Sequence, residues 1–457
     1  MVKRHLLLNA VARSAIPGLL LLSSTAAHSA GFYLIEQSVS SMGTAYANGS
    51  AGMDDASTIF FNPATMTRLQ GQHASGGIHV IYSQVDIDAS ARYNPEHPAI
   101  SGTPLENAPV SGKRKTDTDL LAAVPHGGYS HQLNDRTWLG ITVNGPFGLK
   151  TKYDDNDWVG RYHALRGELR TYNINPAIAF KFSDKASVGF GISAMYGDGD
   201  LTNEVDAGLL VPPQLGGGPG TFDGRAQLDG DDWAWGWNAG ILLEPNDRTR
   251  FGLHYRSKVE LELEGDAKFG TTLPAQVPSQ NFKEDAELDI TMPDLISLSA
   301  WHAVTDKLAL MADVTWTEWS EVEDIRVVRE NGVRLSKWEW EDTVRIAVGG
   351  SYQFDSKWQF RGGVAWDETP TPNDRLRTPY VPDEDRIWLT LGANYRFSKN
   401  LSLDVGYAHL FVDDPEIKNG EDAIDPSKGE TEGLHLLNAD YDASVDMFSL
   451  QVNWAFD

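Results

Sequence analysis

The feature that most constrains the fold of this sequence is a strict alternation of short and long connections. From residue 71 on, runs of alternating apolar and polar residues are separated by six short polar turns, at 133–136, 183–185, 244–248, 304–307, 354–357 and 398–400. Seven long segments rich in Pro, Gly and charge lie between them, at 93–116, 146–166, 203–226, 265–286, 318–337, 367–385 and 412–443. Thirteen connections join fourteen strands. Short turns on one side and long loops on the other are typical of an outer-membrane β-barrel.

The two faces of the expected strands support the same class. The last strand alternates apolar residues with small or polar ones, and so does the strand at 401–411. Lipid outside a barrel and a polar lumen inside it require this pattern. A soluble two-sheet sandwich would also alternate, but one-sided long loops favour an all-β membrane protein. We therefore expect a 14-stranded antiparallel transmembrane β-barrel over residues 71–457.

The first 29 residues are typical of a signal peptide. Lys3, Arg4 and Arg13 give a positive start, Ile16 to Leu22 is apolar, and Ala27-His28-Ser29 supplies small residues for cleavage. The alternative, a transmembrane anchor, is disfavoured because the apolar run is well short of about 20 residues. The mature chain would begin at Ala30, so export across the inner membrane is expected.

The segment 30–70 differs from everything after it. It is rich in small residues and lacks sustained alternation, and Asn62 could cap a turn that begins at Pro63. Eight-stranded barrels are filled by side chains, whereas about 16 strands leave an aqueous channel. A fourteen-stranded barrel would leak unless something filled it. We therefore expect residues 30–70, the hatch segment, to fold into the lumen as a plug.

Composition excludes several other classes. The sequence has no cysteine, which rules out disulfides and thiolate metal sites, and it has no apolar run of about 18 residues. Its net charge is −26, or about −29 without the three basic signal residues, which argues against a nucleic-acid partner. The 12 histidines are scattered, and no Gly-x-Ser-x-Gly or His-Glu-x-x-His motif occurs. We expect no enzyme, cofactor or metal site, although a lipase with a dispersed triad stays an alternative.

Several motifs resemble the FadL family of outer-membrane transporters for long-chain fatty acids and other hydrophobic compounds. They are spread over the mature chain in the family's order: AGFYLIEQ at 30–37, FNPATM at 61–66, PFGLKTKY at 146–153, HYRSKV at 254–259, and DETPTPNDR with YVPDEDRIWLTLGANY within 367–395. The chain departs from the pattern at its end, where Phe456 is followed by Asp457.

The resemblance implies passive uptake across the outer membrane of a Gram-negative cell. Substrate would meet an apolar groove among the outer loops, move to a pocket near the hatch and leave sideways at a kink in the third strand. The implied partners are hydrophobic small molecules, outer-membrane lipid and lipopolysaccharide, and the assembly machinery that reads the C-terminal strand. Nothing in the sequence demands a trimer, and a monomer is expected.

The resemblance also assigns candidate residues. Phe32 would contact the pocket, although it could instead pack the hatch against the wall. Asn62, Pro63 and Ala64 would form a rigid turn that gates the hatch. Gly145, Pro146, Phe147 and Gly148 would form the kink, because proline cannot donate a ladder hydrogen bond and glycine relaxes the pleat. A plain strand end is the alternative for these four residues.

A fatty acid carboxylate needs a cation near an apolar pocket. Three basic residues adjoin family-like motifs: Lys150, Arg161 and Arg256. Each could instead pair with acids such as Asp154 or Glu168. Arg375 and Arg386 are expected to organise their loop through the aspartates 367, 383 and 385. The acidic residues of 412–432 are expected to be a solvated loop rather than a divalent-ion site.

Five tryptophans near the outer ends of strands have two interpretations. Trp233, Trp235, Trp237, Trp338 and Trp340 could line a groove for hydrocarbons, but an aromatic girdle at the membrane interface is the preferred interpretation. Three functions remain open beside fatty acid uptake. They are uptake of aromatic hydrocarbons, a receptor or adhesin without transport, and a general aqueous porin, which the expected plug disfavours.

Overall fold

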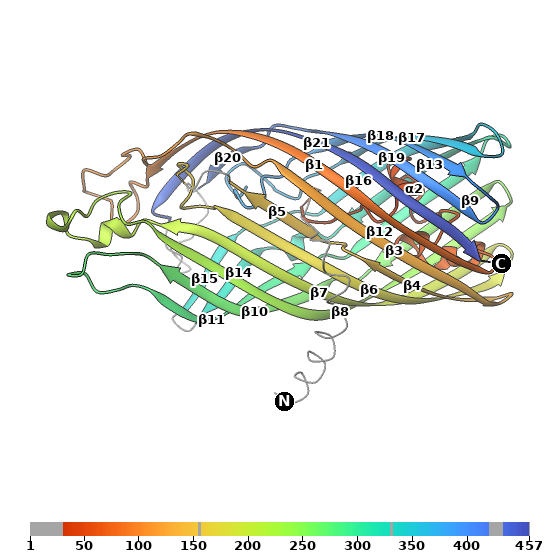
Figure 1. The fold of residues 1–457 in the computed structure, drawn as a ribbon, viewed down its shortest axis with the longest axis horizontal. Helices are drawn as coiled ribbons and strands as arrows, with labels where there is room; N and C mark the ends of the chain where they lie inside the picture. The colour runs from red at the N-terminus through yellow and green to blue at the C-terminus, as the bar shows by residue number, and fades with distance from the viewer. Residues whose placement is uncertain (1–30, 154–156, 330–331, 420–432, 457) are drawn as a thin grey trace, which may run out of the picture.

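A single closed antiparallel sheet forms the wall of the molecule (Figure 1). The structure is a computed structural model that describes residues 31–153, 157–329, 332–419 and 433–456. The expected signal peptide, residues 1–29, lies outside the described residues. Nine of the fourteen passes are single strands: β1 (Gln72–Tyr93), β3 (Leu120–Asn134), β6 (Arg166–Ser183), β7 (Ala186–Val205), β8 (Gly224–Asn246), β17 (Trp358–Asp367), β18 (Arg386–Arg396), β19 (Leu401–Val412) and β21 (His435–Phe456).

The other five passes are each divided into two strands. They are β4 (Thr137–Asn144) with β5 (Gly148–Lys152), β9 (Thr249–Arg256) with β10 (Val259–Gly270), β11 (Phe282–Met292) with β12 (Leu295–Ala303), β13 (Leu308–Thr317) with β14 (Asp324–Arg329), and β15 (Gly332–Lys337) with β16 (Thr343–Gln353). Two short strands, β2 (Lys115–Asp117) and β20 (Glu416–Asn419), pair with β1 and β21 outside this series.

The first and last passes close the barrel. β1 pairs with β21 over its whole length, from Gln72 opposite Phe456 to Tyr93 opposite His435, and its other edge pairs with β3. All six predicted short turns are present, and they lie at the end of the barrel where the chain finishes (Figure 1). The prediction of a 14-stranded antiparallel barrel is confirmed.

The strand faces also follow the prediction. In β21, Phe448 and Leu450 are 60% and 51% exposed on the outer surface, whereas Ser449 and Gln451 between them are 3% and 1% exposed. The outer surface of the wall is therefore apolar and the inner surface polar in this region, as a barrel in lipid requires.

The long connections at 265–286 and 318–337 are shorter than expected. β14 and β15 form a hairpin within 318–337, and β14 pairs with β11. In this outer part of the wall the polarity is reversed. Leu261 and Leu263 of β10 are buried inside, and Glu260 and Glu262 are exposed outside. Charged residues that face solvent made these strands resemble loops, although they extend the barrel beyond the apolar band.

The hatch segment lies inside the barrel, towards the end with the short turns (Figure 1). It contains two single-turn helices, α2 (Val39–Met42) and α3 (Thr58–Phe61), and the 3-10 helix η1 (Pro63–Arg68). From Gly31 to Leu69 every residue is buried except Tyr33, Asp54 and Arg68. The remaining short helices are in the outer connections: η2 (Ala207–Leu210), η3 (Pro213–Leu215) and η4 (Trp319–Glu321).

Candidate functional site

The third pass is interrupted at the predicted kink. β4 ends at Asn144, and β5 begins again at Gly148. β4 pairs with both β3 and β6, but among the described residues β5 pairs with β6 alone. The β3–β4 ladder stops at Gly127, so residues 120–126 of β3 pair with β1 along one edge and have no strand of the third pass along the other. Pro125 lies in that part and has no N–H to leave unpaired.

The interrupted strand turns inward and pairs with the hatch segment. Leu34 N donates to Pro146 O at 2.8 Å, and Gly148 N donates to Phe32 O at 2.8 Å. These two bonds flank an antiparallel bridge between Tyr33 and Phe147. Gln37 Nε2 also donates to Gly145 O at 2.8 Å. The start of the hatch and the kink are therefore joined by backbone hydrogen bonds, directly beside the gap in the wall.

An aromatic cluster surrounds Phe32, which is 1% exposed. Its ring lies 4.7 Å from that of Trp319, 5.4 Å from Trp340 and 6.2 Å from Phe147. The rings of Trp338 and Trp340 lie 5.0 Å apart and are tilted by 33° to each other. Trp338 and Trp340 are 6% and 3% exposed, so the girdle interpretation is wrong for them. It suits Trp235, which is 69% exposed.

A cavity of about 40 Å³ adjoins this cluster. Its walls are almost wholly apolar and include Phe32, Leu149, Leu263, Leu288 and Trp338. A buried water needs at least about 10–15 Å³ of such space, so the cavity could hold a few waters but no long alkyl chain. A hydrophobic guest must therefore displace side chains, and Phe32 is the one that belongs to the hatch segment.

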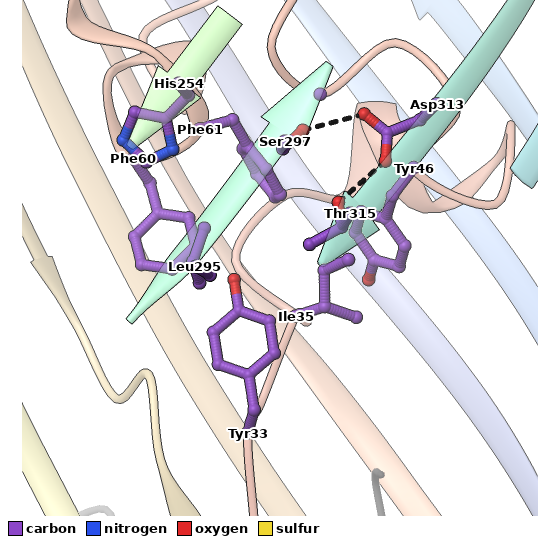
Figure 2. Close-up of a pocket in the computed structure, with 11 residues that line it drawn as sticks. Tyr33, Ile35, Tyr46, Phe60, Phe61, His254, Leu295, Ser297, Asp313 and Thr315 are labelled. Carbon is purple, nitrogen blue, oxygen red and sulfur yellow. Dashed lines mark hydrogen bonds between the residues drawn. The ribbon is translucent and has the colours of Figure 1, made fainter. Parts of the chain in front are cut away.

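A second cavity, of about 20 Å³, lies between the hatch segment and the wall (Figure 2). Tyr33, Tyr46 and Phe60 line it from the hatch, and His254 and Asp313 line it from the wall. The Asp313 carboxylate accepts hydrogen bonds from the hydroxyl groups of three neighbours: Ser297, Ser299 and Thr315. This buried acid is thus satisfied within the wall.

The three candidate cations lie in different places. Lys150 Nζ is 3.8 Å from a carboxylate oxygen of Glu168, a residue that lines the apolar cavity. Arg161 lies in the outer connection and pairs with Asp223 at 2.9 Å. Arg256 is buried in the lumen, where its Nη2 donates to Phe60 O at 2.8 Å. The structure brings Lys150 near Phe32 and leaves Arg161 far from the hatch contacts. Asp154 lies outside the described residues.

The Asn62-Pro63-Ala64 turn is seated on glycines of the wall. Asn62 Oδ1 accepts from Ala64 N at 2.9 Å, and its Nδ2 donates to Ser50 O at 2.7 Å and to Ile241 O at 3.0 Å. A Cβ built on Gly240 would lie 1.9 Å from Asn62 Oδ1, and one on Gly189 would lie 2.3 Å from Ala64 N. Only glycine at these two wall positions leaves room for the turn.

The substitution Gly240→Ala is expected to push the turn off the wall, because the new methyl group overlaps the Asn62 side chain. Gly76→Ala is the matched control, since a Cβ there meets nothing within 4 Å. We expect Gly240→Ala to raise ion conductance in planar bilayers several-fold, with Gly76→Ala unchanged. Equal conductance of the two variants would mean that this seat does not hold the hatch closed.

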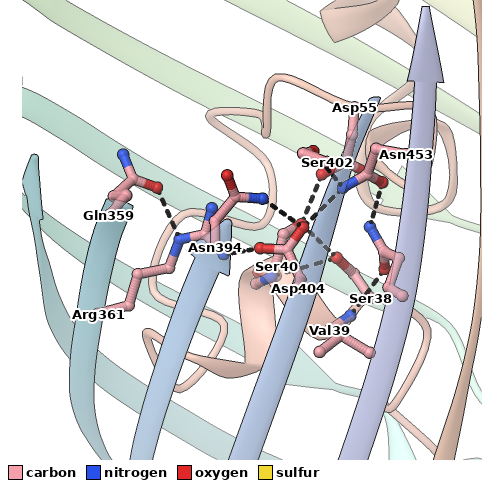
Figure 3. Close-up of polar contacts among 12 residues, drawn as sticks. Ser38, Val39, Ser40, Asp55, Gln359, Arg361, Asn394, Ser402, Asp404 and Asn453 are labelled. Atoms are coloured by element: carbon pink, nitrogen blue, oxygen red, sulfur yellow. Dashed lines mark hydrogen bonds and ion pairs between the residues drawn. The ribbon is translucent and has the colours of Figure 1, made fainter. Parts of the chain in front are cut away.

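A polar network fixes the other end of the hatch segment (Figure 3). Val39 N donates to Gln451 Oε1 of β21 at 2.9 Å, and Gln451 Nε2 donates to Asn453 at 2.7 Å. Asn453 donates in turn to Asp404 at 2.6 Å, and Asp404 also pairs with Arg361. The first residue of α2 is therefore bonded directly to β21 and is linked through Asn453 and Asp404 to β19 and β17, by satisfied polar groups, in contrast to the region around Glu36 described below.

Two kinds of feature are absent from the part of the chain that the structure describes. None of the helices among them is long and apolar enough to cross a membrane. No group of three or more His, Asp or Glu side chains among them is placed to hold a metal ion.

Comparison with known proteins agrees with this geometry. The model of the family described as "Outer membrane protein transport protein (OMPP1/FadL/TodX)" matches residues 20–456. The chain is 30% identical to the long-chain fatty acid transport protein of Escherichia coli O6:H1, covering 97% of this chain and 98% of that one. It is also 30% identical to outer membrane protein P1 of Haemophilus influenzae, over 97% and 99% of the two chains.

Solved structures give the same result. A FadL homologue from Pseudomonas aeruginosa superposes with a TM-score of 0.78 at 26% identity, covering 94% of this chain and all of that one. The toluene transporter TbuX of Ralstonia pickettii has a TM-score of 0.60 at 19% identity, covering 90% of this chain and 97% of that one, which supports the fold alone. The chain therefore belongs to the OMPP1/FadL/TodX family of outer-membrane transport proteins.

Proposed function

We propose that this protein is a passive channel for long-chain fatty acids or related hydrophobic compounds, closed by the hatch segment and opening sideways at the third-pass kink. The observation that carries the proposal is the backbone pairing of residues 32–34 with residues 146–148, directly beside the gap between β3 and β5. In this proposal residues 1–29 are a signal peptide, residues 30–70 are the gate and the rest is the barrel.

An apolar chain that has left water is most stable if it reaches the membrane without entering water again. Burial is worth about 0.8 kcal/mol per CH₂, so a long alkyl chain prefers the apolar interior around Phe32 to a water-filled pore. A sideways exit would pass it to the membrane without returning it to water. A receptor or adhesin would need neither the gap nor the gate.

The more similar relatives favour one substrate class. Two full-length relatives at 30% identity are a long-chain fatty acid transport protein and outer membrane protein P1, whereas the toluene transporter is 19% identical. Fatty acids are therefore the first choice and aromatic hydrocarbons the alternative. Contact with lipopolysaccharide, recognition of the C-terminal strand by the assembly machinery and a monomeric state belong to the same proposal.

Expression in cells that lack their own transporter tests this function. We expect the protein to restore uptake of labelled oleate at least tenfold over the empty vector, at a surface level checked by labelling intact cells. Labelled toluene is measured in parallel. Restored toluene uptake without oleate uptake would move the assignment to aromatic hydrocarbons, and restoration of neither would overturn the transport function.

A further inference from the structure

Beside the start of the hatch segment, three charged side chains form a row on the inner wall. Arg345 of β16 is in register with Asp367 of β17, and Asp367 is in register with Arg386 of β18. All three are buried, with exposed fractions of 6%, 6% and 1%. The Nε of Arg345 lies 4.0 Å from the Asp367 carboxylate, and Arg386 pairs with Asp383.

These arginines have more donors than acceptors around them. In each of Arg345 and Arg386, Nε and Nη1 have no hydrogen-bond partner among the described residues. Nε1 of Trp388, two residues after Arg386 in β18, has no hydrogen-bond partner among the described residues either. The guanidinium carbon of Arg345 lies over the Trp388 ring, 5.3 Å from the ring centroid. Buried donors without partners cost free energy and are rare in native proteins.

The hatch segment places a carboxyl group against this row. Glu36 is 0% exposed, and neither of its carboxylate oxygens has a hydrogen-bond partner among the described residues. Burial raises the pKa of Glu36 to about 7, and Asp367 adds to the rise, whereas the backbone N–H of Glu36 itself and then Arg345 and Arg386 oppose it. Tyr33 and Tyr46 face the same carboxyl group from the hatch segment. The carboxylates of Asp313 and Asp404 accept hydrogen bonds from neighbouring side chains, whereas the Glu36 carboxyl group has no such partner among the described residues.

We propose that Arg345, Asp367 and Arg386, together with Glu36, form a subsite for the acidic head of a hydrophobic substrate. The inference rests on the proposed function and names its substrate class as amphiphiles with a carboxylic acid or similar acidic group. The Glu36 carboxyl group interacts electrostatically with both arginines without a hydrogen bond to either, and it is neutralised by a proton when the substrate's anionic head binds them.

The charges of the row explain why two acidic groups would exclude each other. Arg345 and Arg386 carry two positive charges and Asp367 and Asp383 two negative ones, so the row has no net charge while Glu36 is neutral, and ionised Glu36 would add a negative charge to that of a bound substrate head. A carboxylate can take paired hydrogen bonds from an arginine fork, which would satisfy the unpartnered N–H groups. Two unscreened carboxylates in this space would repel each other, so they should not both be ionised.

The subsite is continuous with the apolar cluster. Asp383, the partner of Arg386, accepts a hydrogen bond from Gly31 N at 2.9 Å. Gly31 precedes Phe32, which lines the apolar cavity. A head bound at the arginines would therefore leave its tail beside Phe32, and binding there would disturb the segment that pairs with the kink.

The test uses hexadecane-1-sulfonate, whose head stays ionised at every pH employed, so any pH dependence comes from the protein. Binding to the purified full-length protein in detergent is measured by calorimetry at pH 6 and pH 8.5. We expect the wild type to bind at least tenfold more weakly at pH 8.5, because Glu36 is then ionised. Glu36→Gln should bind equally well at both pH values. Asp54→Asn, which changes an exposed carboxylate of the same segment, should keep the wild-type dependence.

A second variant tests the donors without altering charge. Trp388→Phe removes one unpartnered N–H and keeps an aromatic ring, and we expect it to weaken sulfonate binding at pH 6 about tenfold. Binding of methyl oleate, which has no acidic head, should not depend on pH in any variant. If Glu36→Gln keeps the wild-type pH dependence, or Trp388→Phe binds sulfonate normally, the row binds only water and the subsite is refuted. Failure of the proposed function would appear separately, as loss of oleate uptake by the wild type.

Discussion

A disulfide between positions 33 and 147 is expected to stop uptake of labelled oleate, and its reduction is expected to restore it. Tyr33 and Phe147 form an antiparallel bridge, and the hydrogen bonds that flank it make this the closely spaced type of pair. Such pairs have Cα atoms about 4.5 Å apart, within the range that a disulfide spans. The double variant Tyr33→Cys, Phe147→Cys should therefore oxidise in the periplasm and lock the hatch to the kink.

The chain is well suited to this experiment because it has no cysteine of its own. The reduced double variant and the two single variants control for loss of the aromatic rings. We expect uptake in the oxidised form to fall at least tenfold below that of the reduced form. Full transport by a completely oxidised protein would show that the hatch need not leave the kink, and the proposed gating mechanism would then be wrong.

Much of the barrel could be predicted because its signals are local. Turns such as 183–185 combine short length with polar residues, and alternation in 401–411 assigns each side chain to lipid or lumen. Pro146 also indicated that pairing would stop at Gly145–Gly148, since proline cannot donate in a ladder, but these residues alone did not distinguish a kink from a plain strand end. The presence of strands and turns thus follows from properties of neighbouring residues, whereas the kink was inferred from the family resemblance.

The contents of the lumen could not be predicted in the same way. Trp338 and Trp340 were expected at the membrane surface, because alternation shows only that two residues share a face. The kind of residue that faces inward changes in the outer part of the wall, where Leu261 and Leu263 of β10 are buried inside and Glu260 and Glu262 point outward. The Glu36 site was missed as well. Arg345 and Arg386, the arginines that act on Glu36, lie 309 and 350 residues away in the chain, and only closure of the barrel brings them together.

The largest loss of binding is expected from a charge placed inside the apolar cavity. Leu263 is 2% exposed and lines that cavity, and it follows Glu262, which faces outward in the same strand. Leu263→Asp removes about 1.5–3 kcal/mol of apolar burial and adds a carboxylate without a partner, so oleate binding and uptake should fall well over tenfold.

Glu262→Asp is the matched control, because it creates the same residue one position away on the outer face. It should bind and transport as the wild type does. Surface level and heat resistance of the folded barrel in detergent must be equal for both variants, since a misassembled protein would also fail to transport. Normal uptake by a folded Leu263→Asp protein would mean that the substrate does not pass the cavity beside Phe32. A route outside the aromatic cluster would then be needed, whereas selective loss would place the alkyl chain between β10 and the hatch segment before it reaches the kink.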